Sequence, residues 1–118
     1  MHEMSLIDSV LRSVTEEAAL KGFAKVKTVW LEVGKLSCVE PEALSFCFVA
    51  LAPSSICEGA ELKLTETAGT AFCPACQKES EISRYGAPCP ECGEYGLEIK
   101  SGDKVFIKQI EVEDEGNV

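Results

Sequence analysis

Two close pairs of cysteines constrain this 118-residue chain more than any other feature. The pairs read CPAC and CPEC, with a twelve-residue spacer between them, and comprise Cys73, Cys76, Cys89 and Cys92. Two residues between the members of a pair let one tight turn present both sulfurs to the same ion. A short hairpin can then bring the second pair opposite the first. Four thiolates in a tetrahedron suit Zn²⁺ and leave no position open to water, so we predict a structural zinc site.

Two alternatives to zinc remain open at this point: four reduced cysteines without an ion, and iron in a rubredoxin-like electron carrier. The chain has seven cysteines, an odd number, and no secretory leader, which favours metal ligands over disulfides. No aromatic-rich shell favours the iron site. Pro74 and Pro90 stiffen the turns, and Gly93 can take a positive φ where the first pair has Gln77. Because this segment is poor in apolar residues, we expect metal binding to be coupled to its folding.

The remainder of the chain predicts an α+β fold of two helices packed on a small three-stranded sheet. An apolar stripe at helical spacing predicts a helix over about residues 3–21: Met4, Ile7, Leu11, Val14 and Ala18. Pro41 suits the start of a second helix over about 40–51. Alternation predicts strands over 25–34 and 61–67, and a third over 104–112 whose buried face the pattern does not decide.

The cysteine pairs lie in an inserted zinc-ribbon lobe of different composition, rich in Cys, Pro and Gly. We therefore expect residues 1–70 plus 101–118 to form the α+β domain and residues 71–100 to form the zinc-binding lobe. A monomer and a homodimer are both compatible with this pattern.

Charge and hydropathy exclude several classes of function. The formal net charge of −9 repels phosphate backbones, so no nucleic-acid partner is expected. No apolar run reaches the ~18 residues that span a bilayer and no leader opens the chain, so we expect a cytoplasmic protein without a membrane partner. One histidine, no nucleophile–base pair and a saturated zinc give an enzyme little support.

The single histidine is the second residue of the chain. A bulky second residue blocks methionine removal, so Met1 should keep a free amine beside the amides of His2 and Glu3. Together with the imidazole these groups form a planar nitrogen set that suits Ni²⁺ or Cu²⁺. The first amides of a helix lack intrahelical partners, so they are free to bind an ion. The positive end of the helix dipole disfavours a cation there, and Glu3 or Glu40 would have to offset this effect. A solvated side chain is the simpler alternative.

Three stretches together resemble the HypA/HybF family: MHEMSL at the start, VWLEVGKLSCVEPEALSFCF in the middle, and CPAC with CPEC near the end. The resemblance runs essentially end to end in the same order. It implies a nickel metallochaperone of [NiFe]-hydrogenase maturation that carries Ni²⁺ as cargo and Zn²⁺ as a structural ion. It also implies roles for individual residues: His2 with neighbouring backbone nitrogens binds nickel, Glu3 tunes the site or helps docking, and Glu40 is an additional candidate ligand.

The resemblance further implies partners: a HypB-type GTPase, the hydrogenase large-subunit precursor and, in some members, urease maturation proteins. The alternative is a zinc-ribbon docking adaptor without nickel delivery.

The other three cysteines, Cys38, Cys47 and Cys57, are not in metal-ligand spacing. We expect Cys47 to be a buried thiol and Trp30 to be core or partly exposed, whereas Cys38, close to Glu40, could face the nickel end but is better explained structurally.

Overall fold

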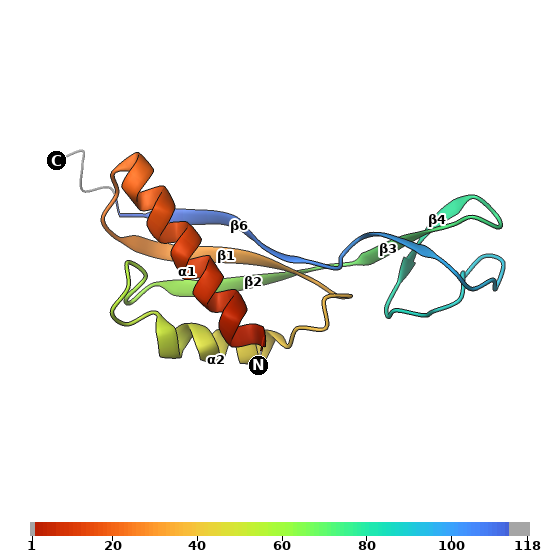
Figure 1. Ribbon diagram of the computed structural model, residues 1–118, viewed down its shortest axis with the longest axis horizontal. Coiled ribbons are helices and arrows are strands. Elements are labelled where there is room, and N and C mark those ends of the chain that lie inside the picture. Colours follow the sequence, from red (N-terminus) through yellow and green to blue (C-terminus); the bar gives the residue numbers. More distant parts are fainter. Residues whose placement is uncertain (1, 114–118) are drawn as a thin grey trace. The chain divides into compact units, whose positions relative to one another are not determined.

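The computed structural model describes residues 2–113 of the chain (Figure 1). Two helices and six strands follow one another in this part: α1 His2–Lys21, β1 Val26–Gly34, α2 Pro41–Leu51, β2 Glu61–Thr67, β3 Gly69–Cys73, β4 Lys78–Ile82, β5 Glu98–Ser101 and β6 Val105–Val112. The predicted α+β class is confirmed, and the three predicted strands and two helices match within a residue at each end. No helix among residues 2–113 is long and apolar enough to cross a bilayer.

Helix α1 buries the stripe that its sequence predicts, except at its first member. The buried residues of α1 begin at Ile7, so core packing starts more than one turn into the helix. Met4, the first residue of the stripe, is 41% exposed. The helix ends at Gly22, whose φ of +83° suits glycine and whose N–H donates to the carbonyl of Ala18 at 2.7 Å.

Helix α2 begins where proline predicts. Glu40 is the N-cap, with an extended backbone at φ −82° and ψ 118°, and Pro41 follows at the first helical position. The core side of α2 carries Leu44, Cys47 and Phe48, all buried, which confirms Cys47 as a buried thiol.

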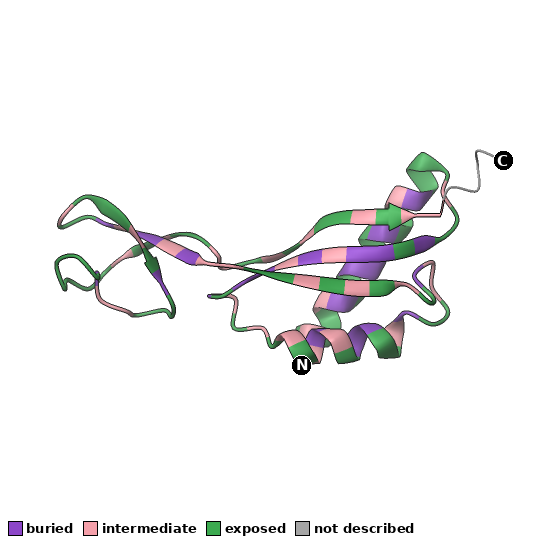
Figure 2. Ribbon diagram, turned by 180° about the vertical axis from the view of Figure 1, so that it is seen from behind, coloured by how far each residue is buried: buried purple, intermediate pink, exposed green. Residues whose placement is uncertain are grey.

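The first sheet has the strand order β2-β1-β6 and is the predicted three-stranded sheet. Its central strand β1 faces the core, since Val26, Val29 and Leu31 are fully buried. Figures 1 and 2 show α1 lying across one face of this sheet. On β1, Trp30 is half-buried, as predicted, with the Lys63 ammonium 5.6 Å from its ring centre.

A second, separate sheet has the order β4-β3-β5, with both neighbours antiparallel to β3. The first cysteine pair lies at the turn between β3 and β4, and the second lies in the segment between β4 and β5. The prediction of a short hairpin within the spacer is wrong: only β4 lies in the spacer, and it pairs with β3, which precedes the first pair.

The described chain packs into two compact units, one of residues 2–31, 39–64 and 106–113 and the other of residues 32–38 and 65–105. The lobe predicted over 71–100 lies within the second unit. That unit also takes in the segment 32–38 from the end of β1, which brings Leu36 into the packing around the zinc-ribbon strands.

Leu36 is 1% exposed and forms the core of the second unit with Ala71 and Ile82. Its backbone N–H donates to the carbonyl of Gly102 at 2.7 Å. A Cβ on Gly69 would overlap the Leu36 side chain, so glycine is required there for this close approach. The small core of the zinc-binding lobe thus depends on Leu36, a residue that lies far from the lobe in the sequence.

Leu36→Ala is expected to destabilise the zinc-loaded protein by about 2–5 kcal/mol, because a fully buried leucine leaves a cavity that a small core cannot close. Urea unfolding followed by circular dichroism measures the effect. The matched control is Lys35→Ala, an exposed neighbour, which should change stability by no more than about 0.5 kcal/mol. Equal stabilities of the two variants would contradict the packing role of Leu36.

Candidate metal centres

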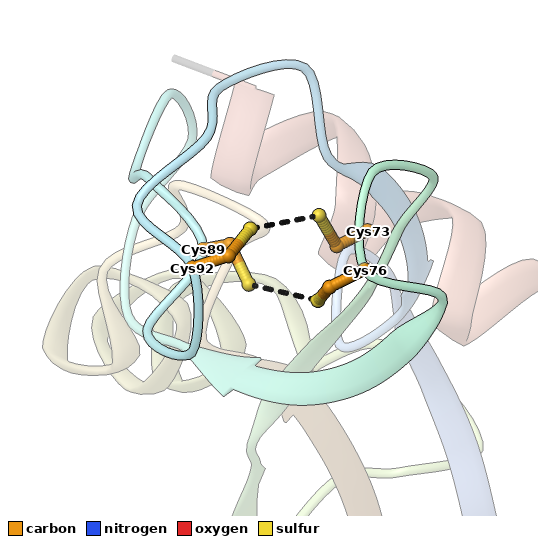
Figure 3. A group of neighbouring side chains, drawn as sticks. All are labelled: Cys73, Cys76, Cys89 and Cys92. Atoms are coloured by element: carbon orange, nitrogen blue, oxygen red, sulfur yellow. Dashed lines mark hydrogen bonds between the residues drawn. The ribbon is translucent and has the colours of Figure 1, made fainter.

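The four predicted zinc ligands come together in the second unit, and the two pairs face each other (Figure 3). All four sulfurs lie within 4.8 Å of one another. The Cys73 and Cys92 sulfurs are 3.6 Å apart, and those of Cys76 and Cys89 are 3.8 Å apart. These distances are far too long for disulfides, whose sulfurs lie about 2.05 Å apart.

The same distances match a tetrahedral metal centre. Zn–S bonds of ~2.3 Å place the sulfurs of a regular tetrahedron about 3.8 Å apart. Desolvation raises the pKa of Cys76 to about 12, so a cation is needed to hold four thiolates together. The residues present therefore fit Zn²⁺, which would fix the two turns against each other as a closed structural site.

Each pair sits on a tight turn of the same construction. The Gln77 N–H donates to the Cys73 carbonyl at 2.7 Å, and the Gly93 N–H donates to the Cys89 carbonyl at 2.8 Å. Gln77 and Gly93 both have a positive φ, 61° and 80°, which confirms the prediction for Gly93 and places a non-glycine residue in the left-handed region at Gln77.

Backbone amides also stabilise one thiolate directly. The Cys92 N–H is the largest influence that lowers the pKa of Cys89 to about 7. The Glu91 N–H donates to the same sulfur at 3.4 Å. The second turn is therefore arranged to favour a deprotonated ligand before any ion arrives.

Exchanging the two turn residues tests this geometry. Gly93→Gln should lower the stability of the zinc-loaded protein by about 1 kcal/mol through backbone strain alone, since a Cβ at Gly93 meets no atom within 4 Å. Gln77→Gly should raise it by up to about 1 kcal/mol for the converse reason. Thermal unfolding measures both changes, and shifts of the same sign in the two variants would contradict it.

The predicted nickel residues lie at the start of α1 and just before α2. His2 is the first residue of α1 and is exposed, and Glu3 follows in the first turn, half-buried. The Glu40 N–H donates to the Glu3 carboxylate at 3.3 Å, which joins the starts of the two helices. A hydrogen bond from its own backbone N–H, with a smaller contribution from that of Glu40, lowers the pKa of Glu3. Met1 lies outside the described residues.

Side chains alone do not build a second metal cage in this part of the chain. Across residues 2–113, the four cysteines form the one group of three or more histidine, cysteine or acidic residues close enough to share an ion. His2, Glu3 and Glu40 form no such group. The exposed Cys38 has a φ of 61° and its thiol lies 3.8 Å from the Leu36 carbonyl, and Cys57 is fully buried, which raises its pKa to about 11.

Two structural features were not predicted from the sequence. Leu36 belongs to the predicted loop after a strand, where only its apolar character in a polar segment signals burial. The outward face of α2 exposes Phe46 and Val49, although a helix rich in apolar residues all round would be expected to be buried.

A two-helix α+β unit joined to a closed tetrathiolate centre defines a metal-binding protein whose resident ion is structural rather than catalytic. Comparison with known proteins makes this more specific. The profile of the family described as the hydrogenase/urease nickel incorporation metallochaperone HypA matches residues 1–112. The chain belongs to the HypA family. It is therefore a maturation factor of the nickel metallochaperone class and not an enzyme, with nickel as the family's cargo.

Two relatives named as hydrogenase maturation factors align with nearly the whole chain. Hydrogenase maturation factor HypA 2 of Bradyrhizobium diazoefficiens is 48% identical over 113 residues, which are 96% of this chain and 100% of that protein. Hydrogenase maturation factor HypA of Rhodopseudomonas palustris (strain BisA53) is 43% identical over 113 residues, again 96% of this chain and 100% of the relative.

Solved structures support the fold. The solution structure of the Ni metallochaperone HypA from Helicobacter pylori matches with a TM-score of 0.72 at 22% identity, covering 95% of this chain and 97% of that one. A second solution structure of a HypA protein gives a TM-score of 0.74 at 20% identity over 98% of each chain. The predicted fold class, with its four-cysteine lobe, is confirmed.

Proposed function

We propose that this chain binds Ni²⁺ at its amino terminus, through the His2 imidazole and the backbone nitrogens of Met1, His2 and Glu3. It then delivers the ion to the [NiFe]-hydrogenase large-subunit precursor together with a HypB-type GTPase. Nickel binding belongs to residues 1–70 plus 101–118, and residues 71–100 form the zinc lobe. The protein works in the cytoplasm, and urease maturation proteins are a second set of partners.

The observation that carries this proposal is an exposed His2 as the first residue of α1, where amide groups lack intrahelical partners. A planar set of amine, amide and imidazole nitrogens suits Ni²⁺, a d⁸ ion. The adjacent Glu3 carboxylate offsets the positive end of the helix dipole. An exposed site at a chain end also lets a receiving protein replace the ligands one at a time.

The amino-terminal nickel site is tested by titrating Ni²⁺ into zinc-loaded protein with its authentic start, followed by calorimetry and visible absorption. The expected result is one equivalent of Ni²⁺ with the absorption of a planar, diamagnetic complex. His2→Ala should abolish that complex while zinc content and circular dichroism stay unchanged. Glu40→Ala should change affinity only if its carboxylate is a ligand. Binding of Ni²⁺ to His2→Ala with unchanged affinity and spectrum would overturn the site.

The alternative function, a zinc-ribbon docking adaptor without nickel delivery, keeps the tetrathiolate centre but has no use for His2. It predicts partner binding by a protein with no Ni²⁺ affinity at its authentic terminus. Transfer of ⁶³Ni from the loaded chain to the purified large-subunit precursor, with the GTPase and GTP present, separates the two. The delivery role requires transfer that His2→Ala abolishes.

A further inference from the structure

The outward face of α2 exposes a group of apolar side chains. We define the outer stripe as the exposed residues Phe46, Val49 and Ala50 of α2, with Glu42 at its start and Pro53 in the turn after the helix. Phe46 is 72% exposed and Val49 is 71% exposed. Figure 2 shows exposed segments along α2, on the helix whose other side lies against the core.

Such exposure is unusual for this helix. The core side of α2 is already occupied by Leu44, Cys47 and Phe48, so the outer stripe has no part in packing the unit. A helix that is apolar on all sides is normally buried, and an exposed apolar surface with a polar edge marks an interaction site. The exposed apolar residues of the stripe are therefore explained by contact with a partner and not by packing within the unit.

The charged residues on the chain segment that contains the stripe have one sign. Arg12 of α1, which lines a pocket together with Leu51 and Ser55, is paired with Asp8 at 2.9 Å. From Leu36 to Leu62 the chain has no lysine, arginine or histidine, and it has four glutamates, all exposed: Glu40, Glu42, Glu58 and Glu61. Carboxylates without neighbouring basic residues along the segment favour a contact face edged with lysine and arginine. They also repel nucleic acid and anionic lipid, which leaves a protein as the occupant.

The position of the stripe connects it to the proposed nickel site. Helix α2 starts directly after Glu40, whose N–H donates to the Glu3 carboxylate at 3.3 Å. A protein that binds along α2 is thereby brought to the end of the unit where His2 begins α1. Docking on the stripe would place the receiving or supplying groups next to the cargo.

We propose that the outer stripe of α2 is the docking surface for the GTPase partner of the proposed function, whose contact face is apolar and edged with lysine and arginine. This inference rests on the proposed function, because it takes the amino terminus as the nickel site. Phe46 and Val49 fill the apolar face of the partner, and Glu42 faces one of its basic residues.

The test measures binding of the purified HypB-type GTPase from the same organism to the zinc-loaded full chain, by calorimetry at two salt concentrations. Phe46→Asp and Val49→Asp should each weaken binding at least tenfold, since exposed aromatic and apolar anchors dominate such interfaces. The matched control is Leu20→Asp, which introduces the same charge at an apolar residue of α1 that is 81% exposed, and should leave binding unchanged. Glu42→Gln should mainly slow association and reduce its salt dependence.

Ni²⁺ affinity, zinc content and circular dichroism are measured on every variant, so that a folding defect is recognised directly. Unchanged GTPase binding by Phe46→Asp and Val49→Asp, or no binding by the wild type, overturns the proposal while the nickel site stands. Failure of the wild type to bind Ni²⁺ overturns the proposed function instead. A dimer in sedimentation that Phe46→Asp converts to a monomer would identify a second copy of the chain as the occupant, which also overturns it.

Discussion

Two residues added ahead of Met1 are expected to weaken Ni²⁺ binding by about 100-fold or more while leaving zinc binding intact. The proposed site uses the terminal amine as a ligand, and an extension turns that amine into an amide within the chain. Changes that only disturb groups around a metal ligand typically cost 10–100-fold in affinity, so loss of a ligand should cost at least as much. The measurement is calorimetry on proteins with authentic and Gly-Ser-extended termini.

The control for this experiment extends the other end of the chain by the same two residues, which should leave Ni²⁺ affinity unchanged. Both proteins should contain one zinc ion and have the same circular dichroism. An extended amino terminus that binds Ni²⁺ with the wild-type affinity and spectrum contradicts a site built from the amine. It would leave His2, Glu3 and Glu40 side chains as the ligands to consider.

Nickel affinity of the authentic protein should also fall as the pH falls. Every proposed nitrogen donor must lose a proton before it binds, so protons compete with Ni²⁺ for these nitrogens. Calorimetric titrations of Ni²⁺ at several pH values measure the effect.

Local patterns in the sequence predicted most of the fold because each one states a local physical requirement. The spacing of Cys73, Cys76, Cys89 and Cys92 predicts a shared ion, and the structure gathers their sulfurs within 4.8 Å. Alternating valine and leucine in β1 predicts a strand with a buried face, and Pro41 predicts the start of α2. Met4 departs from the pattern because periodicity identifies a face of a helix but not where the core ends along it.

The features that the sequence did not predict depend on contacts between distant segments. Leu36 packs with Ala71 and Ile82, at sequence separations that no local pattern encodes. The outer stripe of α2 was not predicted because apolar residues occur on both faces of this helix, so the pattern does not indicate which of them remain exposed. At the amino terminus the proposed donors are backbone atoms, so only the position of His2 in the chain indicates them.

Removal of zinc is expected to unfold the lobe of β3, β4 and β5. Its core is small, with Leu36, Ala71 and Ile82 buried and a few partly buried side chains around them. Structural zinc contributes roughly 10–16 kcal/mol in isolated zinc-finger peptides, far more than so few buried residues can supply. After chelation, amide protons of β3 and β4 should exchange at nearly unprotected rates, whereas those in the buried part of α1 should stay protected.

Single cysteine variants separate the ligands from the other thiols. Cys73→Ser should lower zinc affinity more than about 100-fold and remove the exchange protection of β3, because one ligand of the tetrahedron is lost. Cys38→Ser is the matched control, since Cys38 is exposed and lies outside the four-sulfur cluster, and it should keep one zinc ion per chain. Full zinc content and protection in Cys73→Ser would mean that the lobe folds on its own core. The burial of Leu36 and its neighbours would then have to supply the folding free energy of the lobe without zinc. The zinc titration and the Leu36→Ala variant therefore test the two contributions to that free energy, metal binding and core burial, separately.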